Sequence, residues 1–186
     1  MRQRQKAKTF ARSRLLLLCL AFTLLSAAAR AAEDIATGIR LFESGRLADA
    51  RRFFEALVKK APAEAAGAFY LGRIAFKEEQ YDRAVEWLEK AVQLAGGNSE
   101  YHLWLGRAYG HQAQRATVIQ QPLLARKVKE HFEKAVALDP DNLAARSDLM
   151  DYYLTAPSLL GGSKEKAQKQ AEEIRKRTIQ KNRPIQ

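Results

Sequence analysis

Cysteine is almost absent from this 186-residue chain: the single one, Cys19, stands within the first 31 positions. Beyond residue 31 no thiol is available as a nucleophile, a metal ligand or half of a disulfide. Histidine is scarce as well, and the gaps between His102, His111 and His131, which are 9 and 20, match no helical zinc-binding pair. A GxSxG sequence and a glycine-rich nucleotide fingerprint are also missing. These absences predict a protein that is not an enzyme and holds neither metal nor cofactor.

A long apolar run is missing too. The most apolar segment, Leu15–Leu25, has 11 residues, fewer than the roughly 18 that a membrane-spanning helix needs. Cations precede it and small residues follow it, which is the build of a secretory signal peptide. We therefore expect 1–31 to be a signal peptide, cleaved after Ala29 or Ala31, that exports the protein to the periplasm of a Gram-negative source. The alternative is an uncleaved leader that anchors the protein in the inner membrane.

The strong positive charge belongs largely to this leader. The whole chain carries 32 Lys and Arg against 21 Asp and Glu, a net charge of +11. Residues 1–31 contain seven of the cations and none of the acids, so the remainder carries 25 − 21 = +4. A nucleic-acid-binding protein needs a dense basic face with stacking aromatics. The mixed charges of residues 32–186 predict no nucleic-acid partner.

What the sequence does contain is an internal repeat with a period of 34 (72 − 38 and 106 − 72). The positions that recur at this interval are Gly38, Gly72 and Gly106, then Ala50 and Ala84, and Leu71 and Leu105. Such a period is typical of stacked helix pairs, in which each pair buries the apolar face of its neighbour. Glycine in a helix is unfavourable by roughly 1 kcal/mol relative to alanine, so a recurring helical glycine indicates a close approach by a neighbouring helix.

The pattern resembles the tetratricopeptide repeat family. The residues that carry the resemblance are Leu71, Gly72, Tyr81, Ala84, Leu88 and Ala91, with the pattern restarting at Leu105, Gly106 and Tyr109. The resemblance implies an all-α fold, a right-handed superhelical stack of antiparallel helix pairs. It also implies that the first helices of the pairs line a concave groove that binds protein or peptide partners.

The period lengthens to 44 in the third repeat, between Tyr109 and Tyr153. Ten extra residues therefore fall in the third repeat, and about five more in the fourth. The sequence predicts three to four repeats over residues 32–179, at about 31–64, 65–98, 99–142 and 143–179, followed by a polar tail at 180–186. In the third repeat, Val118 and Ile119 either form a contact site or fold back to cover the widened gap between the helices, and packing is the favoured interpretation.

The fourth repeat contains APSLLGGSKEKA, whose glycine pair invites comparison with a phosphate-binding loop. A phosphate loop requires GxxxxGK followed by Ser or Thr, between a strand and a helix. Here the spacing is absent and Ser163 precedes the lysine. We expect Gly161 and Gly162 to turn the chain and Ser163 to cap the last helix.

A binding site is predicted on the first helices. Arg73 and Arg107 lie one period apart (107 − 73 = 34), as do Lys77 and His111, and four residues separate the two pairs on one helix face. The four should form a basic cluster, and the apolar residues expected to border it are Phe69, Phe76 and Leu103. Arginine suits carboxylates because its planar fork donates two parallel hydrogen bonds.

The predicted ligand of this cluster is an acidic peptide or a chain-terminal carboxylate. The competing interpretation is that the two arginines are ordinary solvated residues paired with acids such as Glu79 or Glu100. The sequence as a whole predicts an exported scaffold that binds a protein or peptide partner in a groove. The first alternative is a membrane-tethered adaptor in an envelope assembly, and the less favoured one is an enzyme of unrecognised type.

Overall fold

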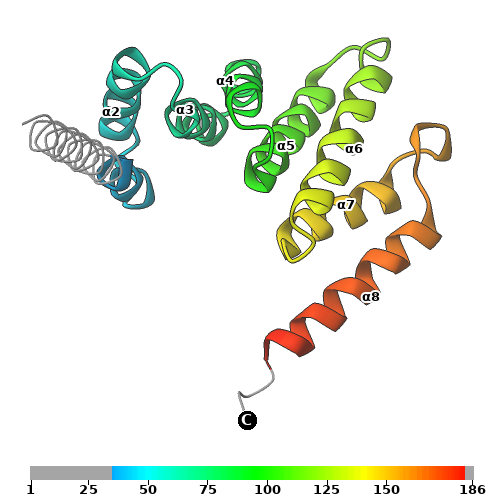
Figure 1. Cartoon of the computed structure of the whole chain (residues 1–186). Coiled ribbons are helices and arrows are strands. Elements are labelled where there is room, and N and C mark those ends of the chain that lie inside the picture. Colours follow the sequence, from blue (N-terminus) through cyan, green and yellow to red (C-terminus); the bar gives the residue numbers. More distant parts are fainter. Residues whose placement is uncertain (1–34, 183–186) are drawn as a thin grey trace, which may run out of the picture. The chain divides into compact units, whose positions relative to one another are not determined.

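The computed structural model describes residues 35–182, so the predicted signal peptide and residues 183–186 lie outside the described residues. The described part of the chain is helical and contains no strand, which confirms the all-α prediction. A helix at 35–43 is followed by α2 (Leu47–Lys60), α3 (Ala65–Lys77), α4 (Tyr81–Leu94), α5 (Ser99–Arg115), α6 (Gln121–Leu138), α7 (Leu143–Thr155), the 3-10 turn η1 (Ser158–Leu160) and α8 (Lys164–Lys181) (Figure 1). None of the helices described is long and apolar enough to cross a bilayer.

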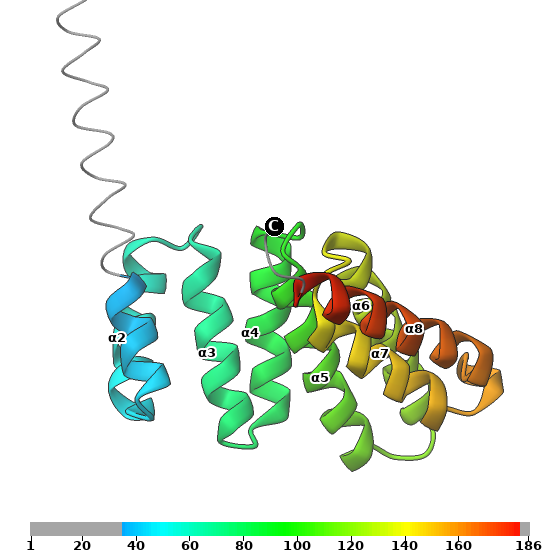
Figure 2. The same cartoon turned by 90° about the horizontal axis from the view of Figure 1, so that it is seen from below.

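The described chain divides between Arg46 and Leu47 into two compact units, and the second holds α2 to α8. Within that unit each helix packs most closely on its neighbour in sequence, and α3–α4, α5–α6 and α7–α8 form the tightest pairs. The first helices of these pairs also touch across one position, α3 against α5 and α5 against α7. Figure 2 shows the resulting stack of hairpins from below.

The recurring glycines lie where two helices of a pair approach each other. A Cβ at Gly72 would stand 2.6 Å from Leu88 of α4, and a Cβ at Gly106 would stand 2.6 Å from Phe132 of α6. No real Cβ tolerates such a distance, so an alanine at either position would push the paired helices apart. The close approach predicted from the repeat is therefore confirmed.

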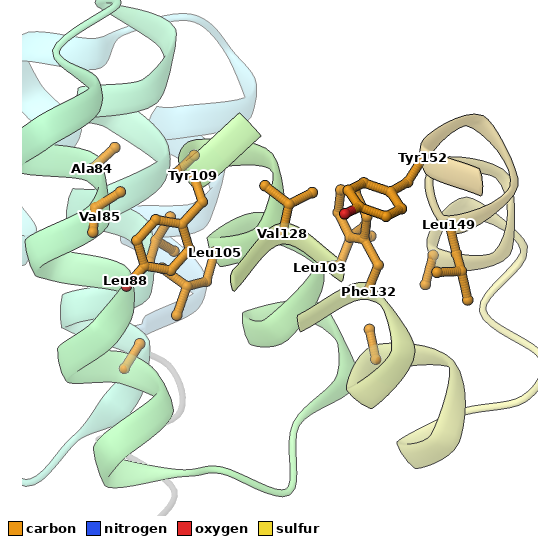
Figure 3. Close-up of a cluster of buried hydrophobic side chains, with 14 of the residues drawn as sticks. Ala84, Val85, Leu88, Leu103, Leu105, Tyr109, Val128, Phe132, Leu149 and Tyr152 are labelled. Carbon is orange, nitrogen blue, oxygen red and sulfur yellow. The ribbon is translucent and has the colours of Figure 1, made fainter. Parts of the chain in front are cut away.

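One continuous apolar core runs through the pairs. Leu88 is completely buried, and so are the small residues Ala84 and Ala91 on either side of it. In Figure 3 Leu88 and Tyr109 mark one end of this core, and Phe132, Leu149 and Tyr152 continue it toward α7; all are buried. Each hairpin alone would expose this face, which is why the pairs stack.

The third pair is longer than the second. Helices α3 and α4 have 13 and 14 residues, whereas α5 and α6 have 17 and 18. The segment 116–120 connects α5 to α6 and closes this longer hairpin. Val118 and Ile119 in this loop are 81% and 90% exposed. The prediction that they fold back to cover a gap is wrong, because both side chains remain largely exposed to solvent.

The connection from α7 to α8 depends on its glycine pair. Gly161 adopts a φ of +97°, a left-handed conformation that favours glycine. A Cβ at Gly162 would stand only 1.8 Å from the carbonyl oxygen of Ala156. Ser163 then caps α8 by accepting a hydrogen bond from the backbone N–H of Lys166, as predicted. Helix α8 continues to Lys181.

Candidate binding surface

Helices α3, α5 and α7 lie side by side and form one wall of the stack, here called the α3–α5–α7 wall. Positions one repeat period apart occupy corresponding turns of α3 and α5. The four residues of the predicted cluster lie on these helices: Arg73 and Lys77 on α3, and Arg107 and His111 on α5.

The two arginines share one aromatic ring. The guanidinium carbon of Arg73 stands 4.4 Å from the ring centre of Trp104, and that of Arg107 stands 4.8 Å from it. A guanidinium over an indole face is held by the ring quadrupole. Trp104 therefore fixes both cations on the wall. Sequence reasoning missed this residue, although it stands one period after Tyr70 (104 − 70 = 34) and both positions carry an aromatic ring.

Arg107 also has an acidic partner, but not one of the two that were expected. Its Nε donates to Oδ2 of Asp148 on α7 at 2.6 Å. Glu79 pairs instead with Arg115 at 2.9 Å, and Glu100 accepts a hydrogen bond from Asn142 at 3.1 Å. The competing interpretation is thus wrong about the acid on Arg107. Because Asp148 occupies only Nε, no described hydrogen bond uses the two terminal nitrogens of Arg107.

Burial sets the electrostatics of Arg73. Desolvation is the largest influence and lowers the pKa of its guanidinium, while Tyr70 and Glu100 act in the opposite direction. The positive charge of Arg107 lowers the pKa further, which places the two guanidinium groups within electrostatic reach of each other. A carboxylate arriving between them would relieve this repulsion.

His111 and Lys77 complete the cluster differently. The imidazole of His111 stacks on Tyr81 at 4.6 Å between ring centres and meets the edge of Phe76 at 5.1 Å. Lys77 is exposed. His111 therefore belongs to an aromatic contact between α3, α4 and α5, while Lys77 lies at an exposed position of α3.

The apolar residues predicted to border the cluster are not equally placed. Phe76 is half-buried and meets Trp104 edge-on at 5.4 Å. Phe69 is 6% exposed and lies beneath Arg73, whose guanidinium carbon is 5.5 Å from the ring centre. Leu103 is only 1% exposed. Leu103 therefore belongs to the core and offers no surface to a ligand, because its side chain is buried within the stack.

The wall changes sign along its length. The first helix of the second pair contributes the cations Arg73 and Lys77, whereas α7 contributes the acids Asp148 and Asp151. Asp151 is exposed and forms no ion pair within the described residues. The two acids and Arg107 line an open cleft of about 740 Å³ between α5, α6, α7 and the turn that follows α7.

Two histidines that looked isolated in the sequence are joined. Nδ1 of His102 on α5 lies 2.9 Å from Nδ1 of His131 on α6, and Nε2 of His102 lies 3.1 Å from the carbonyl oxygen of Gly96. A carbonyl can only accept, so His102 carries its proton on Nε2 and accepts from Nδ1–H of His131. His102 is 6% exposed, not solvent-facing. This pair lies away from the α3–α5–α7 wall and bridges α5 to α6.

Comparisons with known proteins agree with the helix stack. Residues 35–99 match the family model described as tetratricopeptide repeat. No curated protein sequence matches the chain.

Several solved structures share the fold. MamA from Desulfovibrio magneticus RS-1 is 24% identical, with a TM-score of 0.58 over 80% of this chain and 73% of that one. A thermophilic TPR protein of Thermus thermophilus is 19% identical, with a TM-score of 0.63 over 76% and 71% of the two chains. An O-GlcNAc transferase of Thermobaculum terrenum is 20% identical, with a TM-score of 0.65, and the match covers 81% of this chain but 26% of the enzyme. Identities this low establish a shared fold and not a shared activity.

Proposed function

The chain belongs to the tetratricopeptide repeat family, and we propose that it is a non-enzymatic scaffold that binds a partner peptide along the α3–α5–α7 wall. Proteins of this repeat family serve generally in protein–protein interaction, and stacked repeats offer extended binding surfaces. The observation that carries the proposal is the shared use of Trp104 by Arg73 and Arg107. The ring holds both cations in fixed positions on the wall.

The ligand of this arrangement is a carboxylate. Stacking engages the face of a guanidinium, and the N–H groups in its plane stay directed away from the ring. The terminal nitrogens of Arg107 can therefore donate to an acidic side chain or to the carboxyl end of a peptide, with Arg73 and Lys77 adding positive charge nearby. Fixed donors lose little side-chain entropy on binding, which favours affinity.

The same proposal places the protein outside the cytoplasm, in the periplasm of a Gram-negative source. It rests on the charged, apolar and small-residue segments of 1–31. The alternative, a scaffold tethered to the inner membrane by its uncleaved leader, predicts a different N-terminus. Mass spectrometry of the protein from its host decides between them: a chain beginning at Arg30 or Ala32 supports export, and a retained leader supports the tether.

The binding proposal is tested by reversing the two stacked charges. The probe is a fluorescein-labelled oligoglutamate peptide, titrated with the full chain and followed by fluorescence anisotropy. We expect the Arg73→Glu, Arg107→Glu double variant to weaken binding by about tenfold or more, because two attractive contacts become repulsive. Arg126→Glu is the matched control, since Arg126 belongs to α6 and lies outside the wall, and it should bind as the wild type does.

Two outcomes would contradict the proposal. The double variant could bind the peptide as well as Arg126→Glu does. Alternatively, a single-stranded RNA oligonucleotide could bind while the oligoglutamate does not, which would identify the partner as a nucleic acid. Circular dichroism of each variant shows whether the helices are retained.

A further inference from the structure

Gly110 is a helical glycine without a packing reason. A Cβ at Gly67, Gly72 or Gly106 would stand 2.6–2.7 Å from a side chain of the neighbouring helix. A Cβ at Gly110 would meet nothing within 4 Å. Glycine is less favourable than alanine inside a helix. At Gly110 this cost is not explained by a close neighbour, and the glycine leaves open space beside α5.

The preceding repeat fills the corresponding position. Phe76 stands one period before Gly110 (110 − 76 = 34), and its ring packs edge-on against Tyr81 and Trp104, each at 5.4 Å between ring centres. The third repeat therefore lacks an aromatic ring that the second repeat supplies.

The missing ring leaves the open cleft between α5, α6 and α7, here called the Gly110 recess. Its volume is about 740 Å³, and its apolar lining includes Val128 and Phe132 of α6 with Tyr152 of α7. These three side chains are labelled in Figure 3. Its rim carries two acids. Asp148 forms an ion pair with Arg107, and the carboxylate of Asp151 forms no ion pair within the described residues.

We propose that the Gly110 recess receives an aromatic side chain of the partner, with a lysine or arginine next to it set against Asp151. This inference rests on the proposed function, because it places the same partner along the same wall. A flat ring can lie directly on a glycine backbone, and it would take the place that Phe76 occupies in the preceding repeat. The adjacent cation matches the acidic rim.

The sign change along the wall then orients the partner. Its acidic end lies against Arg73 and Lys77 on α3, and its aromatic and basic end lies against α7. A partner running in the opposite direction would place like charges together at both ends, which disfavours that orientation.

A panel of labelled synthetic peptides tests the recess. Each peptide carries two glutamates, a glycine spacer of varied length and then Trp-Lys, and its partner peptide carries Ala-Lys. With the full chain, the best Trp-Lys peptide should bind about tenfold or more tightly than its Ala-Lys counterpart, since buried tryptophans dominate such interfaces. The reversed peptide, Lys-Trp before the glutamates, should lose this advantage.

Gly110→Phe restores the ring of the preceding repeat and should abolish the tryptophan advantage. The matched control is Ala137→Phe, which adds the same ring at an exposed position of α6 outside the recess and should keep the advantage. Asp151→Lys, a change at an exposed residue, should shift the preference from Trp-Lys to Trp-Glu peptides.

The results separate this inference from the proposed function. Three results would contradict the recess proposal: tryptophan gives no gain in affinity, the gain survives Gly110→Phe in a folded variant, or Asp151→Lys leaves the preference for Trp-Lys peptides unchanged. Glutamate-dependent binding that is lost in the Arg73→Glu, Arg107→Glu variant would still support the wall. If no peptide binds, the wall proposal fails, and NMR of the full chain with N-acetyl-tryptophanamide decides on the recess. Shifts centred on the Gly110 amide support it, and shifts elsewhere or none overturn it.

Discussion

The second helix pair (α3–α4) and the third (α5–α6) share the contact that joins their helices but differ on the surface that they present. In both, a glycine of the first helix meets a large residue of the second: Gly72 against Leu88, and Gly106 against Phe132. One turn further on they diverge, because α3 carries Phe76 and α5 carries Gly110. The glycine that lets the two helices approach is kept from one pair to the next, whereas the position one turn further on is not. The difference separates residues that build the stack from residues available for a partner.

We call the contact between the glycine of the first helix and the large residue of the second helix the seam of the pair. Truncating that large residue should have the greatest effect on the free energy of unfolding. Leu88→Ala leaves a cavity at a completely buried position and should lower the free energy of unfolding by about 3 kcal/mol. Phe132→Ala should cost about 4 kcal/mol for the same reason. Urea denaturation followed by far-UV circular dichroism measures both.

Leu154→Ala is the control for these truncations, since Leu154 is 55% exposed on α7. It should change the free energy of unfolding by less than about 0.5 kcal/mol. If Leu154→Ala costs as much as Leu88→Ala, the seam is not the principal source of stability.

The glycines sharpen the comparison, because the same substitution should have opposite signs four residues apart. Gly106→Ala places a methyl group 2.6 Å from Phe132 and should destabilise the protein by about 1–2 kcal/mol, even after the gain in helix propensity. Gly110→Ala meets nothing and should stabilise it by up to about 1 kcal/mol. Equal effects of the two substitutions in thermal unfolding would contradict the assignment of Gly110 to open space.

The features that could be predicted from the sequence are those that recur with the repeat period. The regular recurrence of glycine predicted the seams because their requirement is local and steric, and it repeats from pair to pair. The cluster of Arg73 and Arg107 followed from the period as well. The acid on Arg107 did not, because Asp148 lies on α7, beyond the ten-residue insertion, and therefore falls at no regular interval from its partner.

Hydrogen bonds between successive pairs escaped prediction altogether, although they recur. Tyr109 of α5 donates to Glu89 of α4, and Tyr153 of α7 donates to Glu133 of α6. Each tyrosine follows its glutamate at the same separation of 20. The interval is visible in the sequence, but the recurrence of Tyr109 and Tyr153 indicates only the phase of the repeat. A tyrosine in such a repeat is expected first to be a buried core ring.

Replacing one of these tyrosines should have a smaller effect. Tyr109→Phe keeps the ring and removes the hydroxyl that donates to Glu89 and accepts from Lys127 at 2.9 Å. Burial, followed by the bond to Glu89, raises the pKa of Tyr109 far above its ordinary value, so the hydroxyl keeps its proton. The variant should lose about 1 kcal/mol of unfolding free energy. Glu89→Gln provides the control: combined with Tyr109→Phe it should cost less than the sum of the two changes.

The histidine pair should give the smallest effect, and one that depends on pH. Burial, then the neighbouring His102 and the charge of Lys127, lowers the pKa of His131 to about 4, against the opposing influence of Glu130 and Glu89. An unfolded chain binds this proton near pH 6.5. Between about pH 6.5 and 4 the unfolded state therefore holds more protons than the native state, so the pair's contribution is complete above pH 6.5 and decreases as the pH falls to about 4.

His131→Gln tests this window, because its amide can still donate to Nδ1 of His102 while adding no titrating group at that position. The unfolding midpoint of the wild type should fall more steeply between pH 6.5 and 5 than that of the variant, a range above the ordinary pKa of the carboxyl groups. The ring signals of His131 should titrate near pH 4 in NMR spectra. Parallel profiles for the two proteins, or titration near 6.5, would mean that the bond between α5 and α6 does not hold His131 neutral. The third pair would then be joined by its apolar contacts and by the hydrogen bonds from Lys127 to Tyr109 and from Ser99 to the carbonyl oxygen of Ala135.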